Sequence, residues 1–177
     1  RLVGSEMCIR DRLCDTLQNL GKKPKLVITD SQVFGKVAKE IPSNVMLTSF
    51  SILFAHYKGE LEVQVRGAKA LDHLKNGDKV LICEGCTHHR QCGDIGTEKL
   101  PNWIRKHTGQ EIEFHFTSGT EFPMDLSEYR MIIHCGGCML NEKEMQHRLS
   151  IAKEQGAKMT NYGICIAYIH GILERSL

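Results

Sequence analysis

Two short groups of cysteine and histidine hold the residue types in this sequence that are best suited to chemistry. Cys86 and His88 form a Cys-x-His group, and His134, Cys135 and Cys138 form a His-Cys-x-x-Cys group. Forty-five residues separate the two groups. Thiolates and imidazoles are the ligands that iron–sulfur clusters and zinc ions use in proteins. The pattern therefore predicts a metal centre assembled from two distant parts of the chain.

The second group fits an iron–sulfur cluster. A Cys-x-x-Cys turn lets two sulfurs reach neighbouring irons, and its two glycines leave no side chain where the backbone must approach inorganic sulfide. Their amides can also donate to an anionic cluster near the start of the next helix. We expect Cys86, Cys135 and Cys138 to be the thiolate ligands. Three thiolates leave one iron open, and His134 is the natural candidate to bind it.

Zinc is the main alternative, and chemistry alone separates it only slightly from iron–sulfur. A tetrahedral zinc site would use Cys86, a histidine, Cys135 and Cys138. Cys83 and Cys86 form a further Cys-x-x-Cys pair, which would allow a four-cysteine zinc site. Cys83 also continues an apolar strand, so we favour a packing role for it. A dithiol redox site is the least favoured interpretation.

The other residues of these types receive less specific predictions. Cys14 and Cys165 lie in helical patterns and are expected in the core, and Cys92 is expected not to be a ligand. His88 could bind the metal or hold another ligand by a hydrogen bond.

Composition excludes several classes of function. The chain has 177 residues, of which 41% are hydrophobic and 25% charged, and its net charge is +2. This charge is too small to indicate binding to nucleic acid or to an anionic membrane surface. No apolar run is long enough for a membrane helix, and no secretory signal is visible. Eight cysteines without a signal peptide favour metal binding in a reducing, cytoplasmic compartment over disulfides.

The elements that must position these residues predict an α/β fold with two small domains, each with a mostly parallel sheet flanked by helices. Both groups follow predicted strands, and in a parallel sheet the carboxyl ends of strands share one edge. A turn at Asn76 suggests domains at 13–76 and 77–177, and we exclude 1–12 as a non-native or disordered leader. Strands are expected at 25–30, 45–48, 79–83, 112–116, 130–134 and 159–162, and helices at 31–39, 49–57, 60–74, 100–105, 141–155 and 164–173.

In its two cysteine–histidine groups the sequence resembles the C-terminal part of HydF, the maturation GTPase of [FeFe]-hydrogenases. The family pattern is Cys-x-His, a gap of similar length and His-Cys-x-x-Cys. The resemblance extends over nearly everything after Arg12. The segments that carry it outside the two groups are 25–34, 47–54, 138–141 and 160–163.

The resemblance implies a dimerisation domain followed by a cluster-binding domain. It implies a [4Fe–4S] cluster on Cys86, Cys135 and Cys138, with His134 as a labile fourth ligand. Such proteins act as scaffold and carrier: they receive a diiron precursor from two radical-SAM maturases and deliver it to apo-hydrogenase. The expected assembly is a homodimer or a tetramer.

One departure from the family is large. The chain has no glycine-rich phosphate-binding loop of the GTPase type, so we expect an N-terminally truncated protein that does not use GTP and is not an enzyme. A rival hypothesis is an iron–sulfur hydro-lyase with an open iron as Lewis acid. Asp94, Glu98 and Asp125 are its only nearby acid–base candidates, and their spacing does not support it.

Overall fold

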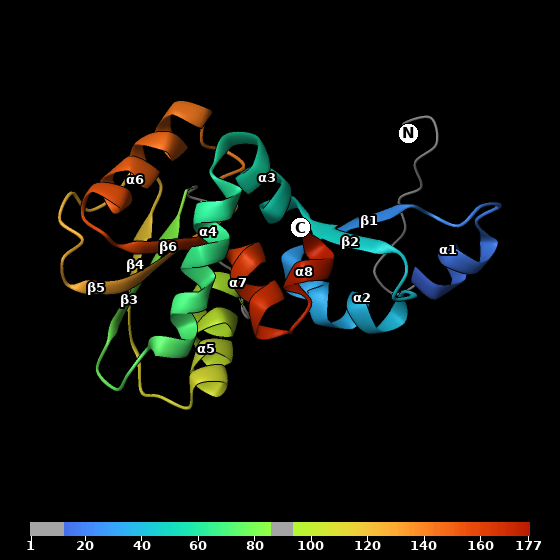
Figure 1. Ribbon diagram of the computed structural model, residues 1–177, viewed down its shortest axis with the longest axis horizontal. Helices are drawn as coiled ribbons and strands as arrows, with labels where there is room; N and C mark the ends of the chain where they lie inside the picture. Colours follow the sequence, from blue (N-terminus) through green and yellow to red (C-terminus); the bar gives the residue numbers. More distant parts are fainter. Residues whose placement is uncertain (1–12, 86–93) are drawn as a thin grey trace.

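The computed structural model describes residues 13–85 and 94–177 and has an α/β fold with two parallel sheets flanked by helices (Figure 1), as predicted. The strands are β1 (Leu26–Thr29), β2 (Met46–Ser49), β3 (Lys79–Glu84), β4 (Glu113–Ser118), β5 (Tyr129–His134) and β6 (Lys158–Asn161). The helices are α1 (Leu13–Asn19), α2 (Phe34–Glu40), α3 (Phe50–Lys58), α4 (Leu61–Ala68), α5 (Leu100–Thr108), α6 (Glu142–Glu154), α7 (Tyr162–Ile169) and α8 (Leu173–Ser176). Short 3₁₀ segments η2 (Ser31–Val33) and η3 (Lys69–His73) and a π-helical segment η4 (Ile95–Lys99) complete it.

The two-stranded sheet consists of β1 and β2, which pair in parallel with Leu26 opposite Met46. Polar side chains begin the helix after each strand. The carboxylate of Asp30 accepts a hydrogen bond from the amide of Gln32 at the start of η2. Ser49 caps α3 by accepting the amide of Ile52.

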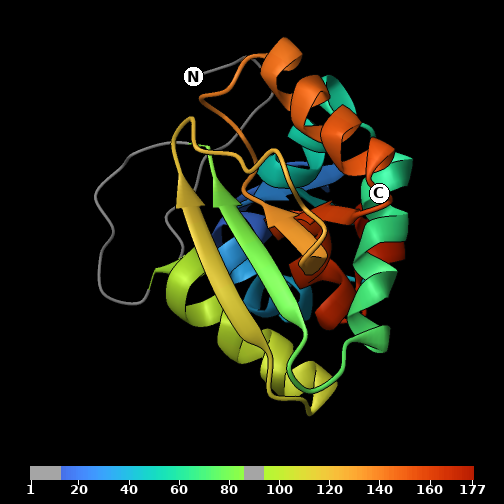
Figure 2. The same cartoon turned by 90° about the vertical axis from the view of Figure 1, so that its left-hand side faces the viewer.

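The four-stranded sheet has the order β4-β3-β5-β6, and all its pairs are parallel. β3 and β5 are central and most of their residues are buried. From β3 the chain crosses through α5 to β4 on one side, and from β5 it crosses through α6 to β6 on the other (Figure 2). The gap between β3 and β5 is therefore the topological switch point of the sheet.

Helices cover both faces of this sheet. Alternate residues of β3, such as Val80 and Ile82, face one apolar cluster that also contains Leu100 and Ile104 of α5. The residues between them, Leu81 and Cys83, face a second cluster that includes residues of α6. Burial on both faces explains why β3 and β5 read as apolar runs rather than alternating patterns.

The larger apolar cluster joins the two sheets. It contains Phe34 and Leu47 from the two-stranded part together with Ile133 and Ile164 from the four-stranded part. Figure 1 shows α7 between the two sheets and α8 beside β2. The hydroxyl of Thr48 donates to the carbonyl of Ser176 at 2.9 Å, so the last helix is fixed to β2.

All six predicted strands are present to within two residues at each end. The single helix predicted at 164–173 is wrong, because α7 ends at Ile169 and α8 begins at Leu173. Gly171 between them has a φ of 68°, a backbone conformation that ends a helix. Within the described residues, no helix combines the length and the apolar character needed to cross a membrane.

Candidate metal centre

The carboxyl ends of β3 and β5 lie side by side at the switch point. Cys83 of β3 is in register with His134 of β5, and the amide of Cys135 donates to the carbonyl of Cys83 at 2.8 Å. The polypeptide leaves both strands at the same edge of the sheet, where α/β folds form their sites. The prediction that the two strand ends converge is confirmed. Cys86, His88 and Cys92 lie outside the described residues, as does the side chain of Cys14.

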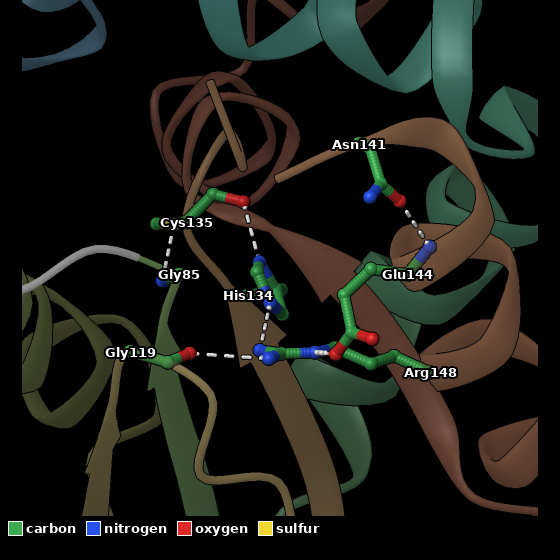
Figure 3. A network of polar contacts seen from close by, with 7 residues as sticks. All are labelled: Gly85, Gly119, His134, Cys135, Asn141, Glu144 and Arg148. Carbon is green, nitrogen blue, oxygen red and sulfur yellow. Dashed lines mark hydrogen bonds and ion pairs between the residues drawn. The ribbon is translucent and has the colours of Figure 1, made fainter. Parts of the chain in front are cut away.

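The sulfur of Cys135 accepts two backbone hydrogen bonds. The amide of Gly85 donates to Sγ at 3.0 Å (Figure 3). The amide of Gly137 donates to the same sulfur at 3.3 Å. Gly85 immediately precedes Cys86 in the sequence, so the backbone just before the first group contacts the sulfur of Cys135 in the second. Amide donors stabilise a thiolate relative to a thiol, and they do the same for a metal-bound sulfur.

The two glycines between the cysteines pack tightly against neighbouring helices. We call residues 135–140 the Cys135 loop. A Cβ on Gly136 would lie 3.0 Å from Oγ of Ser51 on α3, and one on Gly137 would lie 2.8 Å from Sδ of Met145 on α6. Gly137 also has a φ of 62°, which favours glycine. The loop is therefore held between α3 and α6, and it leaves Cys138 exposed to solvent.

His134 is completely buried, and both of its ring nitrogens are hydrogen-bonded (Figure 3). Nη1 of Arg148 lies 2.9 Å from Nε2, and Nδ1 lies 2.8 Å from the carbonyl oxygen of Cys135. Because a guanidinium can only donate, Nε2 accepts and Nδ1 carries the proton. Burial lowers the pKa of His134 to about 4, so the ring is neutral near pH 7. Ligation by His134 stays a prediction, and it would require Nε2 to give up Arg148.

Arg148 organises this side of the site (Figure 3). Its fully buried guanidinium donates from Nε to Glu144 at 2.7 Å and from Nη2 to the carbonyl of Gly119 at 3.1 Å. The carboxylate of Glu144 offsets the charge, and Asn141 caps α6 by accepting the amide of Glu144 at 2.8 Å. Sequence reasoning missed Arg148, although an arginine among the apolar positions Met145 and Leu149 of a helix was a usable signal.

Lys58 holds the other side of the Cys135 loop. It ends α3, is 8% exposed, and donates from Nζ to the carbonyls of Leu140 at 2.6 Å and Cys138 at 3.3 Å. Nζ also lies 4.7 Å from the centre of the Phe54 ring. Sequence reasoning missed this residue as well, because a lysine at the end of a helix is normally expected to be exposed to solvent.

The acids near the site have structural partners. The carboxylate of Asp94 accepts the amides of Gly96 and Thr97 and so caps η4. Glu84 is buried at the end of β3, 3.5 Å from the hydroxyl of Tyr162. Within residues 13–85 and 94–177 no three His, Cys, Asp or Glu side chains form a metal-ligand group. The described part thus contributes two of the three predicted thiolates, Cys135 and Cys138.

Two family domains match the sequence, and together they cover nearly all of it. The hydrogen maturase F dimerization domain matches residues 5–59, and the hydrogen maturase F tetramerization domain matches residues 62–177. The chain belongs to the hydrogen maturase F family. A comparison with curated proteins gave no match. The two domains support a homo-oligomer with a part in hydrogenase maturation.

The matched hydrogen maturase F domains meet between residues 59 and 62. The boundary predicted from the sequence was at the turn after Asn76. α4 lies against β6 of the four-stranded sheet so closely that a Cβ on Gly67 would come within 2.0 Å of the carbonyl oxygen of Met159. The Cys135 loop belongs to the tetramerization domain, and α3, which touches it, belongs to the dimerization domain.

The remaining described thiols of this hydrogen maturase F chain are core residues. Cys83 and Cys165 are both fully buried. Burial raises the pKa of the Cys83 thiol to about 12 and raises that of Cys165 well above its ordinary value. Both stay protonated near pH 7 and pack as small apolar groups, so the packing predictions for them are confirmed.

Proposed function

We propose that this chain is a non-catalytic scaffold of [FeFe]-hydrogenase maturation that binds a [4Fe–4S] cluster through Cys86, Cys135 and Cys138. The observation that carries the proposal is the environment of the Cys135 sulfur. It accepts the amide of Gly85, the residue before Cys86, and the amide of Gly137 within its own Cys-x-x-Cys turn. Two donors from both predicted ligand segments support a shared anionic centre at this edge of the sheet.

The donor set of the described part fits such a cluster. Cys138 is exposed and Cys135 is partly buried against the larger apolar cluster, so the pair lies at the border between the core and solvent. Thiolates need compensating donors or positive charge: two amides donate to the sulfur of Cys135, and the ammonium of Lys58 binds the backbone carbonyl of Cys138. In a cluster bound by three thiolates, one iron would have an open coordination position.

The further steps of the proposal follow the family. The scaffold receives a diiron precursor as cargo from radical-SAM maturases and transfers it to apo-hydrogenase. Three features of this chain suit that exchange: Lys58 binds two carbonyls of the loop, Arg148 binds His134 immediately before it, and Cys138 is exposed to solvent.

The first test is anaerobic reconstitution of the protein with iron and sulfide, followed by metal analysis and low-temperature EPR of the reduced sample. We expect a brown protein with about four irons per chain. Cys86→Ala, Cys135→Ala and Cys138→Ala should each lose the cluster while keeping the fold. Cys92→Ala is the matched control and should keep it.

A colourless protein that holds one zinc, loses it in the same three variants and is destabilised by chelation would overturn the scaffold proposal. It would establish a zinc-stabilised interaction module instead. If the cluster forms, transfer of the diiron cargo is tested by activation of apo-hydrogenase with loaded wild-type protein and with the three variants.

A further inference from the structure

Lys58 is a buried cation whose hydrogen-bond partners belong to the candidate metal-binding loop. Its ammonium donates to the carbonyls of Cys138 and Leu140, on either side of exposed Met139. Among the described residues it has no carboxylate within ion-pair distance, in contrast to Arg148 with Glu144. Burying an ammonium costs free energy unless other charges or dipoles offset it. The two carbonyls and the ring of Phe54 offset part of that cost.

The position of Lys58 places its charge close to the candidate metal centre. The carbonyl of Cys138 places the ammonium next to one of the proposed ligand cysteines. A thiolate at Cys138, and the anionic centre of which it would be part, would supply the counter-charge that Lys58 does not have among the described side chains. The same charge would favour the more negative, reduced state of that centre.

Both ends of α3 contact the Cys135 loop. At the N-terminal end, Ser51 lies against Gly136, so closely that a Cβ there would be 3.0 Å from its hydroxyl. At the C-terminal end, Lys58 binds the carbonyls of Cys138 and Leu140, and Gln146 of α6 donates to the carbonyl of Lys58 at 3.4 Å. A helix of the dimerization domain is thus one wall of a loop in the tetramerization domain.

We propose that Lys58 is a positioning residue for the metal centre: it fixes the Cys138 end of the loop to α3 and supplies positive charge beside the thiolates. The loop-fixing part rests on the two hydrogen bonds from Lys58 to the loop. The charge part rests on the proposed function. Through Lys58 the helix that follows β2 is mechanically connected to the ligand loop.

The loop-fixing part is tested in the metal-free protein by hydrogen exchange. Lys58→Met keeps the approximate length of the side chain and removes its charge and its hydrogen-bond donors. Lys58→Arg keeps the charge and the donors. We expect the amides of residues 137–140 to exchange about tenfold faster or more in Lys58→Met, because hydrogen bonds from a charged donor are lost. Lys58→Arg should restore most of the protection. Lys36→Met, which removes an exposed lysine of α2, should leave the loop unchanged.

The charge part is tested by the reduction potential of the reconstituted cluster. We expect a more negative potential in Lys58→Met than in the wild type, and a wild-type potential in Lys58→Arg and Lys36→Met. Thermal unfolding of every variant establishes that each is folded. Because only the potential requires a cluster, a wild type that binds no iron would overturn the proposed function and the charge part, and hydrogen exchange would still decide the loop-fixing part.

Two results would overturn the inference. Unchanged exchange of residues 137–140 in folded Lys58→Met would show that the loop is held without Lys58. Equal reduction potentials in Lys58→Met and the wild type would show that its charge does not act on the cluster, even where exchange is faster.

Discussion

The two parallel sheets of this protein are buried to very different degrees. In the two-stranded sheet, Leu26, Ile28 and Met46 on one face are 41%, 44% and 56% exposed. In the four-stranded sheet, the central residues Ile82 and Ile132 are fully buried. A parallel sheet is normally covered on both faces, so the exposed apolar face of the first sheet is the unusual one.

The difference separates two tasks. The central strands of the four-stranded sheet are covered on both faces by residues of the same chain, and β5 leads into the Cys135 loop. The two-stranded sheet lies in the part of the chain that matches a dimerization domain, so we expect its open face to be covered by another subunit. Substitutions in the first sheet should therefore change assembly, and those in the second should change stability.

The largest effect is expected for Arg148→Met. The variant leaves the buried ring of His134 and the carboxylate of Glu144 without their shared cation, which should cost about 4 kcal/mol of unfolding free energy. Denaturant unfolding measures this loss. Arg130→Met, at an exposed position of β5, is the control and should change stability by no more than about 0.5 kcal/mol. A similar small change for Arg148→Met would contradict the role assigned to the network.

A matched pair of isoleucines compares the sheets directly. Ile132→Ala removes a side chain that is 0% exposed in β5 and should lower the unfolding free energy by about 3 kcal/mol. Ile28→Ala removes one that is 44% exposed in β1 and should cost less than about 1 kcal/mol in the monomer. Both losses are read from denaturant unfolding at a protein concentration low enough to dissociate the oligomer. Equal losses would remove the distinction between the sheets.

Ile28→Asp tests the assembly role of the open face. The position is 44% exposed, so the charge stays hydrated in the monomer and the loss of stability should be about 1 kcal/mol, close to that of Ile28→Ala. Burying that charge against a second subunit should weaken the homo-oligomer by about tenfold or more. Analytical ultracentrifugation over a dilution series measures the effect, and Ile28→Val is the control that keeps the face apolar. Wild-type assembly of Ile28→Asp would place the subunit contact elsewhere.

The smallest effect is expected at Asp72, in an exposed polar group outside the four-stranded sheet. Hydrogen bonds from Tyr168 and His107 hold the pKa of Asp72 below its ordinary value of 3.8. Since the pKa is lower in the folded state, the stabilisation is present above about pH 4 and is lost as the pH falls through the folded-state value. We expect no more than about 0.5 kcal/mol because the group is exposed. Unfolding measured against pH should show this loss in the wild type and not in Asp72→Asn.

The sequence alone determined the strands, most helices, the family and the candidate ligands. Local rules suffice for these: apolar runs mark β3 and β5, Asn161 and Ser49 cap the helices after their strands, and parallel pairing brings strand ends to one edge. The cysteine–histidine spacing identified the two strand ends that meet, and Gly85 does contact the sulfur of Cys135.

The tertiary structure decided what surrounds the site and which sheet face is open. Arg148 reaches His134, and Lys58 reaches the carbonyl of Cys138 although 80 residues separate them along the chain. The exposure of Ile28 depends on which elements fail to cover it. Periodicity reports only that a residue has an apolar or a polar neighbourhood. The identity of the neighbour is set by packing between elements that are distant in sequence, and no local pattern contains that information.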